Sequence, residues 1–151
     1  MRAICKITDI THEDLVNLFC CAVEGNHAFN IRMDKAEYEK YFPNWKPKEK
    51  CREDRWADML LAGGSVRFYD YYAEDADDFN GTLPHTWDEE DETMYYTVTL
   101  KDIEDALSKA LSSGEYIADY VRHLMSEPEQ VDLTEGYALA QYIMFGEEIY
   151  G

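Results

Sequence analysis

The residues best placed to do chemistry are carboxylates that gather in one segment, from Asp70 to Glu92. This segment contains ten acidic residues and no lysine or arginine. Side chains of one sign repel one another, which costs stability unless a positive partner neutralises them. The predicted partner-binding residues are these carboxylates and the two tyrosines beside the first of them: Asp70, Tyr71, Tyr72, Glu74, Asp75, Asp77, Asp78, Asp88, Glu89, Glu90, Asp91 and Glu92.

The acidic segment could also have one of two other roles. A run of charge is often a solvated loop that maintains solubility. Acidic loops also bind calcium, but the EF-hand loop requires glycine at its sixth position and glutamate at its twelfth. Counting from Asp75 or from Asp77, neither requirement is met. A solvated loop and a protein-binding surface both remain open.

Motifs of enzyme active sites are missing from the sequence. There is no GxSxG, no HExxH and no glycine-rich phosphate loop, and Gly63-Gly64 precedes a predicted strand when a phosphate loop would follow one. Cys20 and His123 could act as nucleophile and base only if folding brought them together. Pairs of carboxylates are expected everywhere in so acidic a chain, so they are no evidence for glycosidase-type catalysis. We expect a protein that is not an enzyme.

The cysteines and histidines do not form a recognisable metal motif. Cys5, Cys20, Cys21 and Cys51 include no CxxC pair. A zinc site could be drawn from Cys20 or Cys21 with His27 and Cys51, but the specific ligand spacings are absent. We expect reduced thiols, with Cys5 and one of the Cys20–Cys21 pair in the core. We therefore predict no metal and no cofactor.

The overall composition is that of one acidic globular domain covering residues 1–151. The chain carries 14 Lys and Arg residues against 32 Asp and Glu residues, a formal net charge of −18. Such a balance argues against direct binding of duplex DNA, which needs a dominant basic surface. The sequence predicts neither a signal peptide nor a transmembrane helix. We expect a cytoplasmic protein that does not bind membranes.

Apolar periodicity predicts several helices around a small sheet. Capping boxes are expected at Thr11–Asp14, Thr99–Asp102 and Asp132–Glu135. The last helix opens at Asp132–Glu135, is apolar almost all round from Gly136 to Phe145, and should be central and buried. Shorter helices are expected near residues 34–42, 56–62 and 115–127, and weaker strands near residues 3–7 and 28–33.

The two clearest strands, Val66–Tyr72 and Met94–Leu100, are predicted to pair as an antiparallel hairpin. Their connection, at about residues 73–93, is long and acidic. Alternation places Tyr69, Tyr71, Tyr95 and Thr97 on the face opposite Val66 and Phe68, which would make a tyrosine-rich acidic face if that side is uncovered. The predicted fold class is α+β, with a small antiparallel sheet packed against several helices.

The sequence contains one basic cluster, between Trp45 and Arg55. Its cations are Lys46, Lys48, Lys50, Arg52 and Arg55. An alternative function is therefore binding of a small molecule or signal nucleotide through residues 46–55, whose cations would hold its phosphate.

Four segments of the sequence form a recognisable pattern: residues 10–15 (ITHEDL), 63–66 (GGSV), 96–100 (YTVTL) and 141–151 (QYIMFGEEIYG). In these segments the chain resembles a group of small acidic proteins encoded by phages and prophages of gut Firmicutes, and the resemblance touches about two-thirds of the chain. The chain departs from that pattern at Pro43–Arg55 and in the acidic connection. The resemblance implies a phage context but transfers no catalytic residue.

The leading hypothesis is a non-enzymatic inhibitor of a host defence nuclease, as anti-CRISPR proteins are. Effector nucleases hold their guide duplex in a positively charged channel. An acidic, tyrosine-bearing hairpin suits such a groove, because arginine both pairs with carboxylates and stacks on aromatic rings. The expected partner is a host protein with a basic groove, such as a Cas nuclease. A phage adaptor protein without a defence role is a further alternative.

Overall fold

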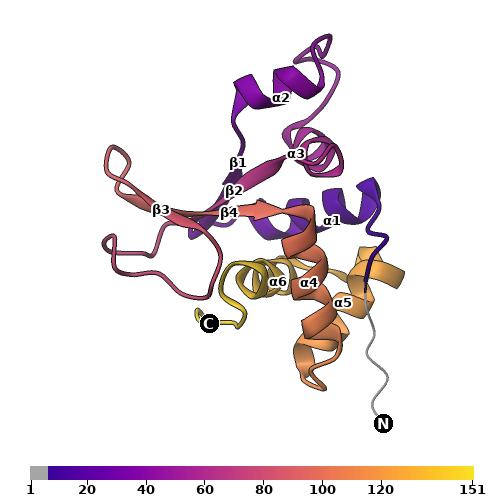
Figure 1. Ribbon diagram of the computed structural model, residues 1–151. Helices are drawn as coiled ribbons and strands as arrows, with labels where there is room; N and C mark the ends of the chain where they lie inside the picture. The colour runs from indigo at the N-terminus through magenta and orange to yellow at the C-terminus, as the bar shows by residue number, and fades with distance from the viewer. Residues whose placement is uncertain (1–6) are drawn as a thin grey trace.

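The computed structural model describes residues 7–151. Its architecture is α+β, as predicted: a four-stranded antiparallel sheet lies against a group of helices (Figure 1). The expected strand at residues 3–7 and the core position of Cys5 lie outside the described residues, apart from Ile7. Across residues 7–151, no helix combines the length and apolar composition that crossing a bilayer needs.

The sheet has the strand order β1-β2-β4-β3. Its strands are β1 (Phe29–Arg32), β2 (Ser65–Asp70), β3 (His85–Asp88) and β4 (Thr93–Thr99). The predicted pairing of β2 with β4 is confirmed, with Phe68 opposite Tyr96. The two strands are not a simple hairpin, because the chain between them forms β3, which pairs with the outer edge of β4.

The described residues form six helices, three of which begin at predicted capping boxes. They are α1 (His12–Val23), α2 (Lys35–Tyr41), α3 (Arg52–Leu61), α4 (Leu100–Leu111), α5 (Tyr116–Ser126) and α6 (Leu133–Phe145). Complete capping boxes begin α1, α4 and α6, in which the cap side chain and the carboxylate three residues later satisfy each other's backbone N–H groups. One 3₁₀ turn, Pro128–Gln130, links α5 to α6.

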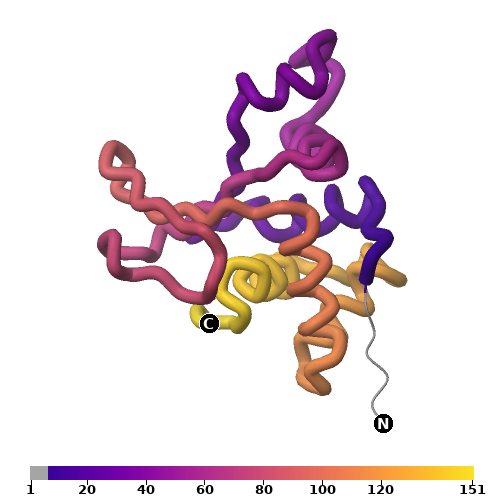
Figure 2. The backbone as a smooth tube through the Cα atoms, in the orientation of Figure 1, coloured from indigo at the N-terminus to yellow at the C-terminus, as the bar shows by residue number. Residues whose placement is uncertain are grey.

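Helix α6 is the buried centre of the helical layer, as predicted. All of its residues from Ala138 to Phe145 are buried, including the polar Gln141. Helix α1 packs directly on α6, and a Cβ at Gly136 would lie 2.5 Å from the backbone carbon of Cys21. This helix pair therefore approaches so closely only because residue 136 is glycine. In Figure 2, α6 is the yellow coil that lies below the strands and leads to the C-terminus.

The core face of the sheet is held by aromatic side chains. Phe68 of β2 meets the edges of Phe19 of α1 and Phe29 of β1, with ring centroids 6.3 and 5.2 Å apart. Tyr96 of β4 packs against Phe145 of α6 at 5.4 Å. These rings pack together with buried aliphatic side chains of the sheet and the helices in one core cluster.

The opposite face of the sheet carries the expected tyrosines but not the expected acidic surface. Tyr69 and Tyr95 do lie on it, but the guanidinium of Arg32 lies 4.7 Å above the Tyr69 ring and that of Arg67 lies 4.9 Å above the Tyr95 ring. Tyr69 is only 3% exposed as a result. The centre of this face is therefore a layer of arginines over tyrosines and is not acidic.

Candidate partner-binding surface

Strand register places the acidic residues at one end of the sheet. Asp70 lies opposite Met94, and Asp88 lies opposite Thr93. The segment after β2 and the turn between β3 and β4 therefore leave the sheet at the same end, on the left of Figure 1. We call residues 71–84 the acidic loop and residues 89–92 the acidic turn, and the two together with Asp88 the acidic end.

The carboxylates of the acidic loop also fix its backbone. Asp75 Oδ1 accepts a hydrogen bond from the N–H of Asp77 at 2.9 Å, and Asp78 Oδ2 accepts one from the N–H of Glu74 at 2.9 Å. Glu74, Asp75 and Asp77 remain exposed, and Asp78 is half-buried. Part of the acidic composition is thus explained by turn chemistry, since aspartate readily accepts from backbone N–H groups two to four residues away.

The acidic turn is built in the same way. Asp88 Oδ1 accepts hydrogen bonds from the N–H groups of Glu90 and Asp91, at 3.0 and 3.2 Å. Glu92 adopts a left-handed conformation, with φ of 51°. The side chains of Glu89, Glu90 and Glu92 are exposed to solvent. In the described part of the chain, they form no hydrogen bond or ion pair.

The acidic loop also packs against the rest of the protein. Its glycine at position 81 has φ of 78° and lies against the backbone of Met144 and Phe145 at the end of α6. The N–H of Asn80 donates to the hydroxyl of Tyr96 at 3.1 Å. The long connection is therefore a fixed part of the surface, which favours a binding role over that of a solvated tether.

Asp70 does not belong to the surface, contrary to expectation. Its side chain faces the core and the residue is 1% exposed. It accepts hydrogen bonds from the hydroxyl of Tyr150 at 2.9 Å and from the N–H of Tyr72 at 3.0 Å. Burial nevertheless raises the pKa of this carboxyl above its usual range, and Asp78 adds to the increase. Asp70 is a structural residue that anchors the C-terminal tail.

The remaining acidic residues are barely neutralised from within the chain. In the region described, the one ion pair of the acidic end joins Asp91 to Arg32 at 3.4 Å, with both side chains about half exposed. Exposed pairs of this kind contribute little to stability. The acidic end therefore carries a concentrated negative charge.

Aromatic side chains accompany this charge. Tyr72 is 56% exposed and Phe79 is 44% exposed, and the ring of Phe79 stacks on His85 with centroids 3.9 Å apart. Tyr71 is half-buried, and its hydroxyl lies 3.4 Å from the guanidinium of Arg32. Tyr72 and Phe79 thus offer flat apolar surface beside exposed carboxylates, and aromatic side chains are enriched in protein interfaces.

The basic cluster at residues 46–55 is largely neutralised by nearby carboxylates. Lys50 Nζ lies 2.5 Å from Asp58, Arg52 lies 2.9 Å from Glu53, and Lys46 lies 3.9 Å from Glu49. The guanidinium of Arg55 lies 5.2 Å from the Trp45 ring centroid. Most of the cations expected to hold a phosphate are therefore already paired, which disfavours the alternative nucleotide site.

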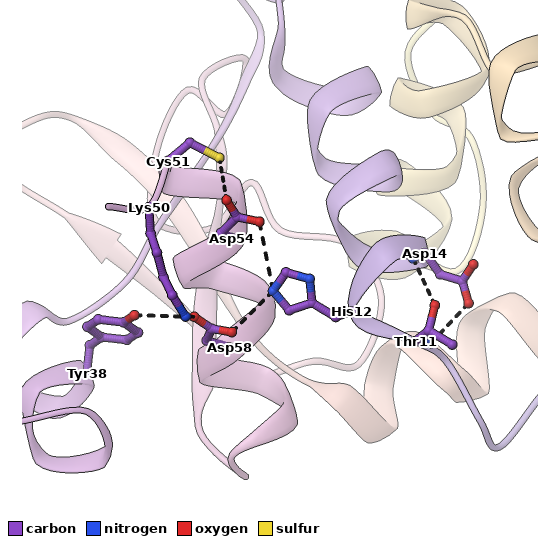
Figure 3. A network of polar contacts seen from close by, with 8 residues as sticks. All are labelled: Thr11, His12, Asp14, Tyr38, Lys50, Cys51, Asp54 and Asp58. Atoms are coloured by element: carbon purple, nitrogen blue, oxygen red, sulfur yellow. Dashed lines mark hydrogen bonds and ion pairs between the residues drawn. The ribbon is translucent and has the colours of Figure 1, made fainter. Parts of the chain in front are cut away.

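A second polar cluster joins α1, α2 and α3, as Figure 3 shows. His12 Nε2 lies 3.2 Å from Asp58 and 3.9 Å from Asp54, and the hydroxyl of Tyr38 donates to Asp58 at 3.4 Å. The Cys51 thiol donates to Asp54 at 3.0 Å, and this hydrogen bond raises its pKa. Because each group is engaged with another protein group, the cluster ties the three helices together and presents no activated nucleophile.

The cysteines of the described residues favour the thiol over the thiolate form, because each of them has a raised pKa. Cys20, Cys21 and Cys51 are free, and burial together with nearby acidic groups raises the pKa of Cys20 to about 11. His123 binds Glu135 at 2.6 Å, which raises the pKa of the imidazole. Within residues 7–151, no group of three His, Cys, Asp or Glu side chains is arranged to hold a metal ion.

The fold and surface define an α+β protein with an acidic, aromatic end built from one loop and one turn. Comparisons with protein-family models, with curated proteins and with solved structures found no match.

Proposed function

We propose that this protein is a phage-encoded, non-enzymatic inhibitor of a host defence nuclease, and that it binds the basic groove of its target with the acidic end. The carrying observation is that nine carboxylates lie at one end of the sheet and a single one of them, among the described residues, is in an ion pair.

Electrostatics supports a basic protein partner. Carboxylates held in one region steer a positively charged protein toward it and suppress wrong partners. Nucleases that carry a guide hold the nucleic acid in a positively charged channel. A surface that offers carboxylates and the rings of Tyr72 and Phe79 matches the arginines of such a channel, because arginine pairs with both.

The thiols and the histidine outside the acidic end also support a non-catalytic role. The Cys20 thiol is held protonated, and the Cys51 thiol is engaged by Asp54. His12 is shared between two aspartates, and one of them, Asp58, is bound by Lys50. The two thiols are poor nucleophiles, because a cysteine attacks as its thiolate.

The test is displacement of labelled target DNA from guide-loaded Cas nucleases by the purified protein, at several salt concentrations. We expect displacement that weakens steeply with salt, because both steering and affinity are electrostatic. Two triple variants remove three charges each: Glu74→Gln with Asp75→Asn and Asp77→Asn in the acidic loop, and Glu89, Glu90 and Glu92→Gln in the acidic turn. Each should weaken displacement by about tenfold.

A matched control removes three charges from the helical side, by changing Glu115, Glu127 and Glu129 to Gln; all three residues are exposed. It should displace DNA almost as well as the parent protein. Equal losses in all three variants would mean that total charge alone matters. Failure to displace DNA from any nuclease tested, or displacement unaffected by both acidic variants, would refute the proposal.

A further inference from the structure

A cleft of about 350 Å³ opens beside the acidic loop. It lies between the turn that joins α1 to β1, the first turn of α6 and the C-terminal tail. Because Phe29 lies opposite Asp70 in the sheet, this cleft is at the same end of the sheet as the acidic loop and acidic turn. Its walls include Glu24, His27, Tyr72, Leu133, Tyr137 and Glu148.

The charged groups of this cleft are carboxylates. Glu24 and Glu148 line it, and no lysine or arginine does. Glu148 is held in place because the hydroxyl of Tyr116 donates a hydrogen bond to it. The helix N-terminus at the cleft is already capped by Asp132, which accepts from the N–H of Glu135 at 2.8 Å. The fixed charge of the cleft therefore favours a cation.

Two tyrosines give the cleft flat walls. Tyr72 and Tyr150 form a T-shaped pair, with ring centroids 5.0 Å apart. Tyr137 is half-buried, and its hydroxyl forms no hydrogen bond within the described residues. Burial raises the pKa of this hydroxyl, and the charges of Asp70 and Glu148 raise it further, so it remains protonated and able to donate or accept.

We infer that this cleft is the anchor site for one arginine side chain of the partner. This inference rests on the proposed function in assuming a basic partner. A guanidinium stacks on tyrosine rings and binds carboxylates through two parallel hydrogen bonds, so it uses both kinds of wall at once. Lysine has a compact, strongly hydrated charge and uses the rings less well. Tyr72 joins the two regions, because it lines the cleft and is the second residue of the acidic loop.

The experiment uses the full chain and N-acetyl-arginine amide as the probe, followed by ¹H–¹⁵N NMR. N-acetyl-citrulline amide is the matched control, since it has nearly the same shape without the charge. We expect the arginine amide to shift the N–H signals of Gly25, Ala28 and Thr134, which line the cleft. The citrulline amide should leave them in place.

Two neighbouring glutamates provide matched variants. Glu148→Gln removes a wall charge and keeps an oxygen that accepts from Tyr116, so it should weaken arginine binding by about five- to tenfold. Glu147→Gln removes the same charge one residue away, at an exposed position outside the cleft lining, and should have little effect.

Several outcomes would overturn the inference. The first three are an absence of N–H signal shifts at the cleft, equal shifts with the citrulline amide, and shifts confined to the acidic loop. The fourth is that Glu147→Gln weakens binding of the arginine amide as much as Glu148→Gln does. Equal binding of N-acetyl-lysine amide would overturn the choice of arginine. The proposed function has a separate test. If the acidic loop and acidic turn variants displace DNA as well as the parent protein does, the nuclease proposal is refuted. Binding of the arginine amide to the cleft would still support the cleft site.

Discussion

Gln141 provides the sharpest test of how the C-terminal tail is held. The side chain is 0% exposed in the centre of α6. Its Oε1 accepts hydrogen bonds from the N–H groups of Ile149 and Tyr150, at 2.9 and 2.7 Å, and its Nε2 donates to the carbonyl of Tyr150 at 3.1 Å. One buried amide thus satisfies three backbone groups of the tail.

Gln141→Leu removes these three hydrogen bonds with little change in volume. Each is worth about 0.5–1.5 kcal/mol net, and the tail groups left behind must either stay unpaired or detach to reach water. Detachment would also give up the contact of Tyr150 with Phe145 and its hydrogen bond to Asp70. Since leucine recovers part of the apolar burial, we expect a loss of about 2–4 kcal/mol in the free energy of unfolding.

Urea unfolding measures that loss, and amide hydrogen exchange at Ile149 and Tyr150 reports the tail directly. Both amides should exchange faster in the variant. Gln130→Leu makes the same chemical change at an exposed position in the 3₁₀ turn and should alter stability by less than about 0.5 kcal/mol. If Gln141→Leu is equally mild and the two amides keep their protection, the assignment of Gln141 as the tail's anchor is wrong.

Two further predictions concern the core. Leu139→Ala, at a fully buried position of α6, should cost about 2–5 kcal/mol in urea unfolding, and a near-neutral result would mean that α6 is not the centre of the packing. Because burial raises the folded-state pKa of Asp70 above its unfolded value, its stabilising contribution is complete at low pH and is lost as pH rises through the folded pKa. The free energy of unfolding of the parent protein minus that of Asp70→Asn should therefore increase on acidification from neutral pH. A difference that stays constant across the pH series would contradict the burial argument.

The helices are where sequence and structure agree most closely. The capping boxes at Thr11, Thr99 and Asp132 begin helices as predicted, because the groups that satisfy each other are three residues apart in the chain. The C-terminal helix could be recognised as central because it is apolar on every side. Strand β4 was also evident, since Met94, Tyr96 and Val98 alternate with more polar residues.

Strand β3 was missed because its signal is not local. His85–Asp88 is four residues long, is largely exposed and does not alternate between apolar and polar. It exists because the edge of β4 supplies its hydrogen-bond partners. The tail bound by Gln141 and the cleft lined by Tyr137 and Glu148 were missed for the same reason, since each joins segments that only the fold brings together.

The sequence by itself determined where three of the helices begin, the α+β class and the accumulation of acidic charge, because these depend on composition and on neighbours within a few residues. Only the tertiary structure decided what individual charges do. It buried Asp70 against Tyr150, paired Lys50 with Asp58 and placed Arg32 and Arg67 over tyrosine rings. The physical reason is that the energy of a charge depends on its burial and on groups within a few ångströms in space.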